Sequence, residues 1–458
     1  MSFSHTSRPS YVKALTQNKY DLLVIGGGIT GCGIALDATL RGLKVALVEQ
    51  ADFASGTSSR STKLIHGGLR YLKQLELKLV HDVGRERAIV FQNARHIVIP
   101  EKMLLPIVQG GTLSARTTSI ALWVYDLLAG VKKSEARKML SLQNTLHEEP
   151  LLSHQKVIGG GLYYEYRTDD ARLVIELAKS AVAHGAVCIN YTQVTGLLYN
   201  EHKKVCGANV TDALTNGAFE IKAAKVVNAA GPFVDELRKT DHSLQGKRLL
   251  LTKGVHIVVP YDKLPLRHAV YFDVADGRMI FAIPRNGVTY IGTTDTIYKG
   301  DIDKPKANAA DVVYLLDATN EMFPMAMLQI SDVISSWAGL RPLIYEDGKS
   351  PSELSRRDEI LVSPSGLISM VGGKLTGYRL MAKKIADLVA KELTMATRKF
   401  PKSSTHDYQL SGGAFDSDEA LKVFAEHITN AHQYNFISTF MRRSWVYRYE
   451  AMQYKYWK

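Results

Sequence analysis

Cysteine is scarce in this sequence, and long apolar runs are missing. The three cysteines, Cys32, Cys188 and Cys206, are too few and too scattered for a disulfide framework or a zinc cluster. The best apolar run, Ile120–Tyr125, ends at Asp126, far short of the roughly 18 residues that a bilayer-spanning helix needs. We therefore expect a protein of a reducing, cytoplasmic compartment, with no spanning helix and no metal centre.

Acidic residues are scarce at both ends of the chain. Residues 1–19 contain none and contribute +3, and residues 441–458 hold five cations against one anion, which contributes +4. The whole chain has 57 Lys+Arg against 45 Asp+Glu, a formal charge of +12, so the body between the ends is only mildly basic. The charge and the lack of a zinc-finger or RNP-like signature therefore do not indicate nucleic acid. Residues 1–19 also lack the apolar core of a secretory signal, and we expect a loose leader there.

No residue class is present in unusual excess. Of the 458 residues, 46% are apolar and 22% are charged. This composition is ordinary for a globular protein and excludes a fibre or a disordered tail. The length predicts about two to three domains.

A glycine-rich turn between two predicted strands is the clearest motif. The apolar run Tyr20–Ile25 predicts a buried strand, and Gly26, Gly28 and Gly31 follow it. Helical spacing comes next, and a second strand, Lys44–Glu49, ends on an acid. Strand, glycine turn, helix, strand and acid together form a dinucleotide-binding pattern.

Each part of this pattern has a physical task. Gly26 permits the tight turn, Gly28 lets the backbone approach a pyrophosphate, and Gly31 allows the helix to pack closely on the strand. The free amides of the helix N-terminus attract phosphate. Glu49 is expected to bind ribose hydroxyls, and its charge disfavours NADP. The pattern alone leaves FAD and NAD both open.

The segment after Glu49 favours FAD over NAD. Asp52–Lys63 is a loop of small and hydroxyl-bearing residues, and Leu64–Tyr71 contains a His-Gly-Gly turn. This combination resembles the FAD-binding start of the D-amino-acid-oxidase-like flavoprotein superfamily. Within that superfamily it is similar to the FAD-dependent glycerol-3-phosphate dehydrogenases of the bacterial, aerobic type.

The resemblance covers roughly residues 18–412, with further motifs in family order. Ala230 and Phe233 stand where Thr and Trp are more usual, and both keep their turn small and apolar. The further motifs are Tyr164–Leu173, Lys225–Asp235, Lys253–Ile257, Gly292–Asp295, Trp337–Pro342 and Gly372–Arg379.

The resemblance implies an α/β fold with two interleaved domains. A Rossmann-like FAD-binding domain is expected from residues 18–85, 160–240 and 355–398. An antiparallel-sheet substrate domain is expected from residues 86–159 and 241–354. Residues 399–458 form a C-terminal segment that is short or altered relative to the family.

Two segments leave alternatives open. A helix is expected at Asp418–His427, and the aromatic and basic tail Phe436–Lys458 is interpreted as a poorly packed terminus. Stacking on nucleic acid or binding at a membrane interface are the alternatives for that tail. Thr117–Lys133 is interpreted as a core helix, and a monotopic membrane helix is its alternative.

The resemblance also implies a reaction. Bound FAD is expected to take a hydride at N5 from C2 of sn-glycerol 3-phosphate, which gives dihydroxyacetone phosphate, and a membrane quinone is expected to take the electrons. An oxidase that uses O2 and a catalytically silent flavin-binding protein remain as alternatives. We expect a cytoplasmic protein, and both peripheral attachment to the inner face of the cell membrane and a homodimer stay open.

The site residues are carried over from the matching motifs. His256 is the expected general base, with His66 as its rival, and Arg341 is expected over the reacting oxygen. The expected substrate-binding residues are Arg70, Tyr71, Arg356 and Lys374. The expected cofactor-binding residues are Gly26, Gly28, Gly31, Glu49, Ser58, Ser59, His66, Val194, Gly231, Gly373, Lys374, Leu375 and Thr376.

Overall fold

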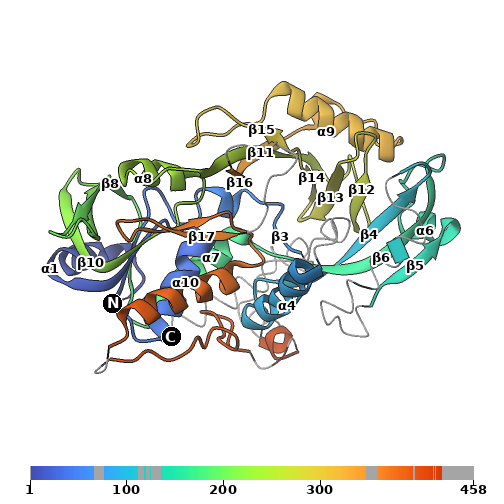
Figure 1. Cartoon of the computed structure of the whole chain (residues 1–458). Coiled ribbons are helices and arrows are strands. Elements are labelled where there is room, and N and C mark those ends of the chain that lie inside the picture. The colour runs from blue at the N-terminus through green and yellow to red at the C-terminus, as the bar shows by residue number, and fades with distance from the viewer. Residues whose placement is uncertain are drawn as a thin grey trace.

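Two β-sheets organise the computed structural model, and the strands of each come from separated parts of the chain (Figure 1). The view in Figure 1 places β8 and β10 near one end of the molecule and β4, β5 and β6 near the other. The structure describes residues 2–66, 77–111, 118–119, 124, 136–346, 358–395, 398–415, 417 and 419–424.

The first sheet is built around parallel strands. Its central strands β10, β1, β2 and β7 pair in parallel in that order, and β18 continues this arrangement beside β10. An antiparallel strand, β17, closes one edge, and β9 and β8 extend from β10. The strands are β1 (Lys19–Ile25), β2 (Val45–Val48), β7 (Val187–Ile189), β8 (Thr192–Tyr199), β9 (Val205–Asp212), β10 (Ala218–Asn228), β17 (Glu359–Val362) and β18 (Ile368–Val371).

Apolar helices cover this sheet because its central strands are buried on both faces. Helix α2 is apolar nearly all round and packs between α7 and α10, which contact it on either side. Helix α10 turns Met381, Ile385 and Val389 toward the same core at helical spacing. The helices are α1 (Arg8–Gln17), α2 (Ile29–Leu40), α7 (Asp170–Ala183) and α10 (Tyr378–Leu393).

The second sheet is mainly antiparallel. Its longest strand, β11, pairs with β14 on one side and with β16 on the other, and β4 and β12 form its parallel pair. The strands are β3 (Leu64–Ile65), β4 (Ile99–Val108), β5 (Lys138–Ser141), β6 (Val157–Arg167), β11 (Lys247–Pro260), β12 (Ala269–Asp273), β13 (Met279–Arg285), β14 (Val288–Gly292), β15 (Thr296–Ile297) and β16 (Ser335–Glu346).

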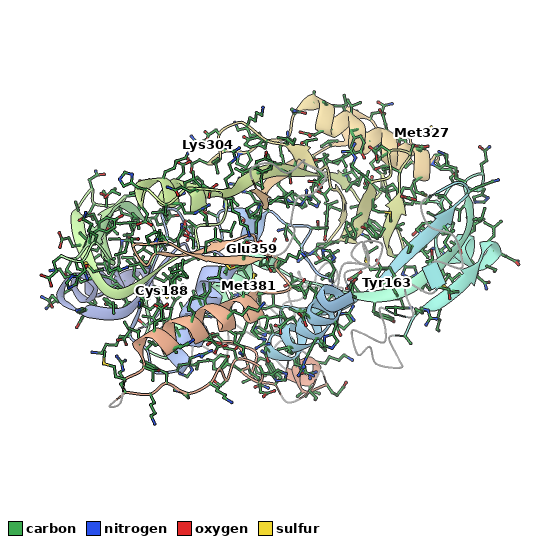
Figure 2. All side chains as sticks on the ribbon, in the orientation of Figure 1. Tyr163, Cys188, Lys304, Met327, Glu359 and Met381 are labelled. Atoms are coloured by element: carbon green, nitrogen blue, oxygen red, sulfur yellow. The ribbon has the colours of Figure 1, made fainter. Side chains whose placement is uncertain are left out.

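Helix α9 packs on this second sheet through a core of its own. Leu315, Leu316 and Met322 of α9 are buried against Val255 and Ile257 of β11. Further helices of the described residues are α4 (Leu77–Asn93), α6 (Leu142–Glu148), α8 (Val234–Thr240) and α9 (Ala309–Met322). In Figure 2, the labels Cys188 and Met381 lie in the part of the molecule that contains the first sheet, and Tyr163 and Met327 lie in the part that contains the second.

The architecture confirms the predicted fold class. A parallel, helix-covered sheet is joined to an antiparallel sheet, and the chain passes between them several times. Strands β3 and β6 pair with each other in the second sheet. Strand β3 lies within residues 18–85, and β6 extends into residues 160–240, the two stretches expected in the FAD-binding domain. Of the C-terminal expectations, residues 419–424 are helical, and Phe436–Lys458 lies outside the described residues, as does most of Thr117–Lys133. Among the described residues, no helix is both long enough and apolar enough to cross a bilayer.

Candidate active site

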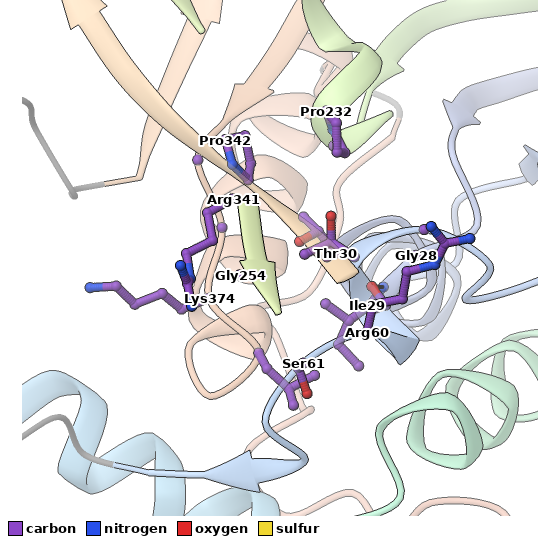
Figure 3. A pocket seen from close by; sticks show the side chains of 18 of the residues that line it. Gly28, Ile29, Thr30, Arg60, Ser61, Pro232, Gly254, Arg341, Pro342 and Lys374 are labelled. Atoms are coloured by element: carbon purple, nitrogen blue, oxygen red, sulfur yellow. Dashed lines mark hydrogen bonds between the residues drawn. The ribbon is translucent and has the colours of Figure 1, made fainter. Parts of the chain in front are cut away.

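A cavity of about 800 Å³ is lined by residues of both sheets. Figure 3 shows Gly28, Ile29 and Thr30 on one side of this cavity, and Arg341 and Lys374 on the other. The first sheet contributes mainly turns at strand ends, whereas the second contributes side chains from within its strands. Ligands of open parallel sheets typically bind at such strand ends.

The first glycine turn leaves no room for side chains. Gly26 has φ of +112°, and a Cβ atom on Gly31 would lie 1.9 Å from the Gly26 carbonyl oxygen. Helix α2 therefore starts directly against the end of β1. At its N-terminus, the Ile29 amide donates to Ser58 Oγ at 2.9 Å, and a Cβ on Gly28 would lie 3.0 Å from the same oxygen. This bare turn at a helix N-terminus fits a pyrophosphate.

Glu49 closes this turn at the end of β2. Its Oε2 accepts from the Gly27 amide at 2.6 Å, and its Oε1 accepts from the Ala51 amide at 2.9 Å. Burial raises the pKa of the carboxyl, and the hydrogen bonds from Ala51 and Gly27 oppose that rise. Backbone amides thus hold the carboxylate in place at the cavity wall, beside Val194 of β8.

A second glycine turn lies beside the first, where a Cβ on Gly373 would come within 3.6 Å of Thr30 Oγ1. Gly373 has φ of +126°, and its amide donates to Asp358 Oδ1 at 2.7 Å. Thr376 Oγ1 donates to the His66 carbonyl at 3.1 Å, which ties the turn to the loop after β3. Helix α10 begins directly after this turn, at Tyr378. The positive end of its dipole therefore lies at the cavity.

His256 lies in the middle of β11 and is only 2% exposed. Its ring stacks on Trp337 of the neighbouring strand β16, with centroids 4.7 Å apart and planes 9° apart. On the other side it packs against Gly292 of β14, where a Cβ would lie 2.1 Å from the ring. Its Nε2 is 3.0 Å from Thr62 Oγ1.

The environment of His256 keeps its ring neutral. Burial, together with the positive charges of Arg341 and Lys63, lowers the pKa of the imidazole to about 3. The ring therefore carries one bare nitrogen throughout the neutral pH range. A neutral imidazole is a hydrogen-bond acceptor and a proton acceptor, as the expected base requires.

Arg341 of β16 is held by the segment that follows β14. Its Nη1 donates to the Thr294 carbonyl at 2.9 Å and to Asp295 Oδ1 at 3.2 Å, and its Nη2 donates to Thr293 Oγ1 at 2.8 Å. A Cβ on Gly254 would lie 2.6 Å from Nη2, so only glycine leaves space for the guanidinium there. The Arg341 side chain is still 35% exposed, toward the cavity that it lines.

His66 and Glu165 also line the cavity, and Glu165 forms a buried ion pair behind it. Burial lowers the pKa of the His66 imidazole, whereas the charge of Glu165 acts in the opposite direction. Glu165 Oε2 accepts from Arg87 Nη1 at 2.9 Å, and both side chains are buried. His66 lies edge-on to Phe281, with ring centroids 6.1 Å apart.

Most of the expected site residues come together at this cavity. Gly31 and Ser59 are not among its lining residues: Gly31 packs on Gly26, and the Ser59 carbonyl accepts from Lys63 Nζ at 2.9 Å. Arg70, Tyr71 and Arg356 lie outside the described residues. The expected residues that line the cavity are Gly26, Gly28, Glu49, Ser58, His66, Val194, Gly231, His256, Arg341, Gly373, Lys374, Leu375 and Thr376.

Sequence reasoning missed several residues that shape this site. Thr62 and Glu165 line the cavity, and Asp295 and Asp358 hold Arg341 and Gly373 in place. Thr62, Glu165 and Asp295 each lie within a motif or loop that the sequence singled out, which is the signal that could have found them. Their partners, however, come from other strands, and spacing along the chain does not reveal such pairs.

The fold and the glycine-lined cavity indicate a dinucleotide-binding protein, and comparison with known proteins specifies its class. The model of the family "FAD dependent oxidoreductase" matches residues 21–387. The chain therefore belongs to the FAD-dependent oxidoreductase family, in the branch of the aerobic glycerol-3-phosphate dehydrogenases. The expected cofactor, FAD, is confirmed at the level of this family.

Two curated relatives and one solved structure place the chain within this family, and a second solved structure shares its fold. The aerobic glycerol-3-phosphate dehydrogenase of Bacillus subtilis (strain 168) is 54% identical over 92% of this chain and 76% of that protein. The protein of the same name from Staphylococcus aureus (strain MRSA252) is 54% identical over 93% of this chain and 77% of its own length.

The structure of glycerol-3-phosphate dehydrogenase from Bacillus halodurans complexed with FAD has a TM-score of 0.79 and 47% identity, and covers 94% of this chain and 75% of that one. L-alpha-glycerophosphate oxidase from Mycoplasma pneumoniae with FAD bound has a TM-score of 0.64 and 20% identity, and covers 86% and 99% of the two chains. At that identity the second likeness concerns the fold alone.

Proposed function

We propose that this protein oxidises sn-glycerol 3-phosphate to dihydroxyacetone phosphate with FAD and passes the electrons to a quinone. One observation carries the proposal: a bare glycine cradle, a neutral His256 and the cation Arg341 all line the same cavity. The names of the curated relatives, aerobic glycerol-3-phosphate dehydrogenases, support the same substrate.

The cofactor would lie along the first sheet. The Gly26–Gly31 turn and the N-terminus of α2 would hold the pyrophosphate, and Glu49 would hold the ribose beside Val194. Gly231 and the 373–376 turn would border the flavin end. Bound FAD supplies the redox chemistry by accepting a hydride from the substrate.

Cations at the other end of the cavity would bind the substrate. A dianionic phosphate favours Arg and Lys donors, and Lys374 lines the cavity close enough to act on His66. Arg341 would donate to the reacting oxygen at C2, because Asp295 and Thr293 fix its guanidinium while leaving it partly exposed. Arg70, Tyr71 and Arg356 are proposed to complete this site on the strength of the family motifs.

His256 would take the proton of the C2 hydroxyl. Its ring is held between Trp337 and Gly292, so its direction is fixed before the substrate binds. Besides burial, the cations Arg341 and Lys63 keep the pKa of the imidazole at about 3. A bound phosphate dianion would oppose the charges of Arg341 and Lys63 and raise the proton affinity of the imidazole.

The domain division and the cellular setting are part of the proposal. Residues 18–85, 160–240 and 355–398 would form the FAD-binding domain, and 86–159 with 241–354 the substrate domain. The basic chain ends would favour an anionic membrane surface, which suits a peripheral position at the inner face of the cell membrane and a quinone acceptor. Association as a homodimer is proposed with it.

Anaerobic titration of the purified holoprotein tests this function. Glycerol 3-phosphate should bleach the flavin absorption, and a soluble quinone should restore it, whereas glycerol without phosphate should do neither. Admitting air separates the alternatives, since rapid reoxidation with release of peroxide would identify an oxidase. Bound flavin that glycerol 3-phosphate never bleaches would contradict the proposal and leave a silent flavin-binding protein.

A further inference from the structure

The loop of residues 60–63 covers the end of the His256 side chain. The Nδ1 atom of His256 is buried and has no hydrogen-bond partner among the described residues. The Nε2 atom instead faces the Thr62 hydroxyl at 3.0 Å. Thr62 itself is only partly buried and lines the cavity. Of these two residues, Thr62 therefore presents the more accessible polar atom to a ligand in the cavity.

The position of Thr62 is fixed from three sides. Asp170, which is fully buried, accepts from Ser61 Oγ at 2.6 Å and from Lys63 Nζ at 2.8 Å, so both neighbours of Thr62 are anchored. The Thr62 carbonyl accepts from the Tyr290 hydroxyl at 3.2 Å. A hydroxyl held this firmly is pre-organised to keep one contact with the ring and one with the cavity.

Trp337 couples the same loop to the His256 ring. Its indole stacks on the ring, and its Nε1 donates to the Ser61 carbonyl at 3.2 Å. The loop, the indole and the imidazole therefore form one packed unit. The indole thus contacts both the imidazole and the loop that carries Thr62.

We propose that the Thr62 hydroxyl is a catalytic relay that carries the proton of the substrate hydroxyl to His256 Nε2. This inference rests on the proposed function and adds a residue to it. The O–H bond of the substrate breaks as a new bond forms to Thr62 Oγ1, and the original Thr62 proton moves to Nε2. The hydroxyl ends the step as it began, and no electrons are exchanged in this proton transfer.

The relay requires one tautomer of the resting imidazole. Nε2 must be bare to receive the proton, so the ring proton must lie on Nδ1. Nitrogen-15 NMR of the histidine-labelled wild-type holoprotein, without substrate, tests this directly. An unprotonated Nε2 for His256 is expected, and a protonated Nε2 in the resting protein would overturn the relay.

Substitution of Thr62 gives the kinetic test. Thr62→Val keeps the shape and removes the hydroxyl, and should lower the rate of flavin reduction by glycerol 3-phosphate about 100-fold or more, since general acid–base steps contribute factors of this size. Thr62→Ser restores the hydroxyl and should recover most of that rate. Adding His256→Gln to Thr62→Val should cost little more, because the two residues serve one proton path.

A matched control separates this loss from damage to the fold. Thr319→Val removes a hydroxyl in α9 that is more deeply buried than that of Thr62 and donates to the Leu315 carbonyl, away from the cavity, and it should leave the rate unchanged. Bound flavin and the unfolding midpoint are measured for every variant. If wild-type flavin fails to bleach, the proposed function is wrong. If wild-type flavin bleaches and Thr62→Val reduces it at the wild-type rate, only the relay is wrong.

Discussion

The two walls of the cavity are built on opposite principles. The wall from the first sheet consists of turns from which side chains are absent, at Gly26, Gly28 and Gly373, and Gly31 packs directly against Gly26. The wall from the second sheet consists of large side chains, above all His256 and Arg341, held by their neighbours. The first wall suits a cofactor that the backbone approaches closely. The second suits a small substrate that side chains bind and orient.

The difference determines what each wall tolerates. At Gly26 and Gly31, an added Cβ would meet backbone atoms, which cannot give way. In the second wall, the function depends on donors at particular distances, and a residue of similar size can fill the space without restoring them. Mutations in the first wall should therefore remove the cofactor, and mutations in the second should remove turnover.

Gly31→Ala should have the largest effect. The new Cβ would lie 1.9 Å from the Gly26 carbonyl oxygen, so α2 must move away from β1. We expect loss of bound FAD and a fall of at least about 3 kcal/mol in the free energy of unfolding, at the upper end of overpacking costs. Chemical denaturation and the flavin content of the purified protein measure both.

The control for Gly31→Ala is Gly377→Ala, at the start of α10. Gly377 has φ of −92°, and a Cβ there would meet nothing within 4 Å. This variant should keep its FAD and its stability. Equal losses in both variants would mean that close packing of α2 is not what the first wall depends on.

Arg341→Lys tests the second wall. Lysine keeps the charge but loses the planar fork that donates to Thr294, Asp295 and Thr293 at once. We expect kcat/KM for glycerol 3-phosphate to fall about 100- to 1000-fold, as removal of a fixed donor does elsewhere, with FAD retained. Steady-state kinetics with a dye acceptor, and the flavin spectrum, measure the two quantities.

Arg398→Lys is the matched control for Arg341→Lys. Arg398 pairs with Asp21 at the surface, at 2.6 Å, and does not line the cavity. Its replacement should leave kcat/KM unchanged. If Arg341→Lys releases FAD, cofactor binding does not depend on the first wall alone.

The first wall could be predicted largely from the sequence, and the second only in part. The glycines of β1–α2 and the acid Glu49 follow one another within a short stretch, so spacing alone indicates a dinucleotide site. His256 and Arg341 could be selected only through the family resemblance. Their partners Thr62 and Asp295 come from other segments: the pairing of β11 with β14 and β16 brings Asp295 to Arg341, and contacts of the 61–62 loop with Tyr290 and Trp337 bring Thr62 to His256.

The pH dependence of the free energy of unfolding tests whether His256, in the second wall, is neutral in the folded protein. Burial lowers the folded-state pKa of His256 to about 3, against about 6.5 in an unfolded chain. Between these values the unfolded state binds one more proton, so this contribution to stability falls as the pH falls. From pH 6 to pH 5 the wild type should lose about 1 kcal/mol more than His256→Asn, measured by urea denaturation. Parallel losses in the two proteins would mean that His256 is not held neutral.

The smallest effect is expected where the two walls meet. Thr57 lies in the loop between β2 and β3, and its Oγ1 donates to the Leu340 carbonyl of β16 at 2.8 Å. Thr57→Val removes this hydrogen bond and should lower the free energy of unfolding by about 1 kcal/mol. Thr57→Ser keeps the donor and should stay close to the wild type. Because Leu340 directly precedes Arg341, the KM for glycerol 3-phosphate should also rise in Thr57→Val. A loss of stability without any change in KM would mean that the walls are joined there but not coupled in function.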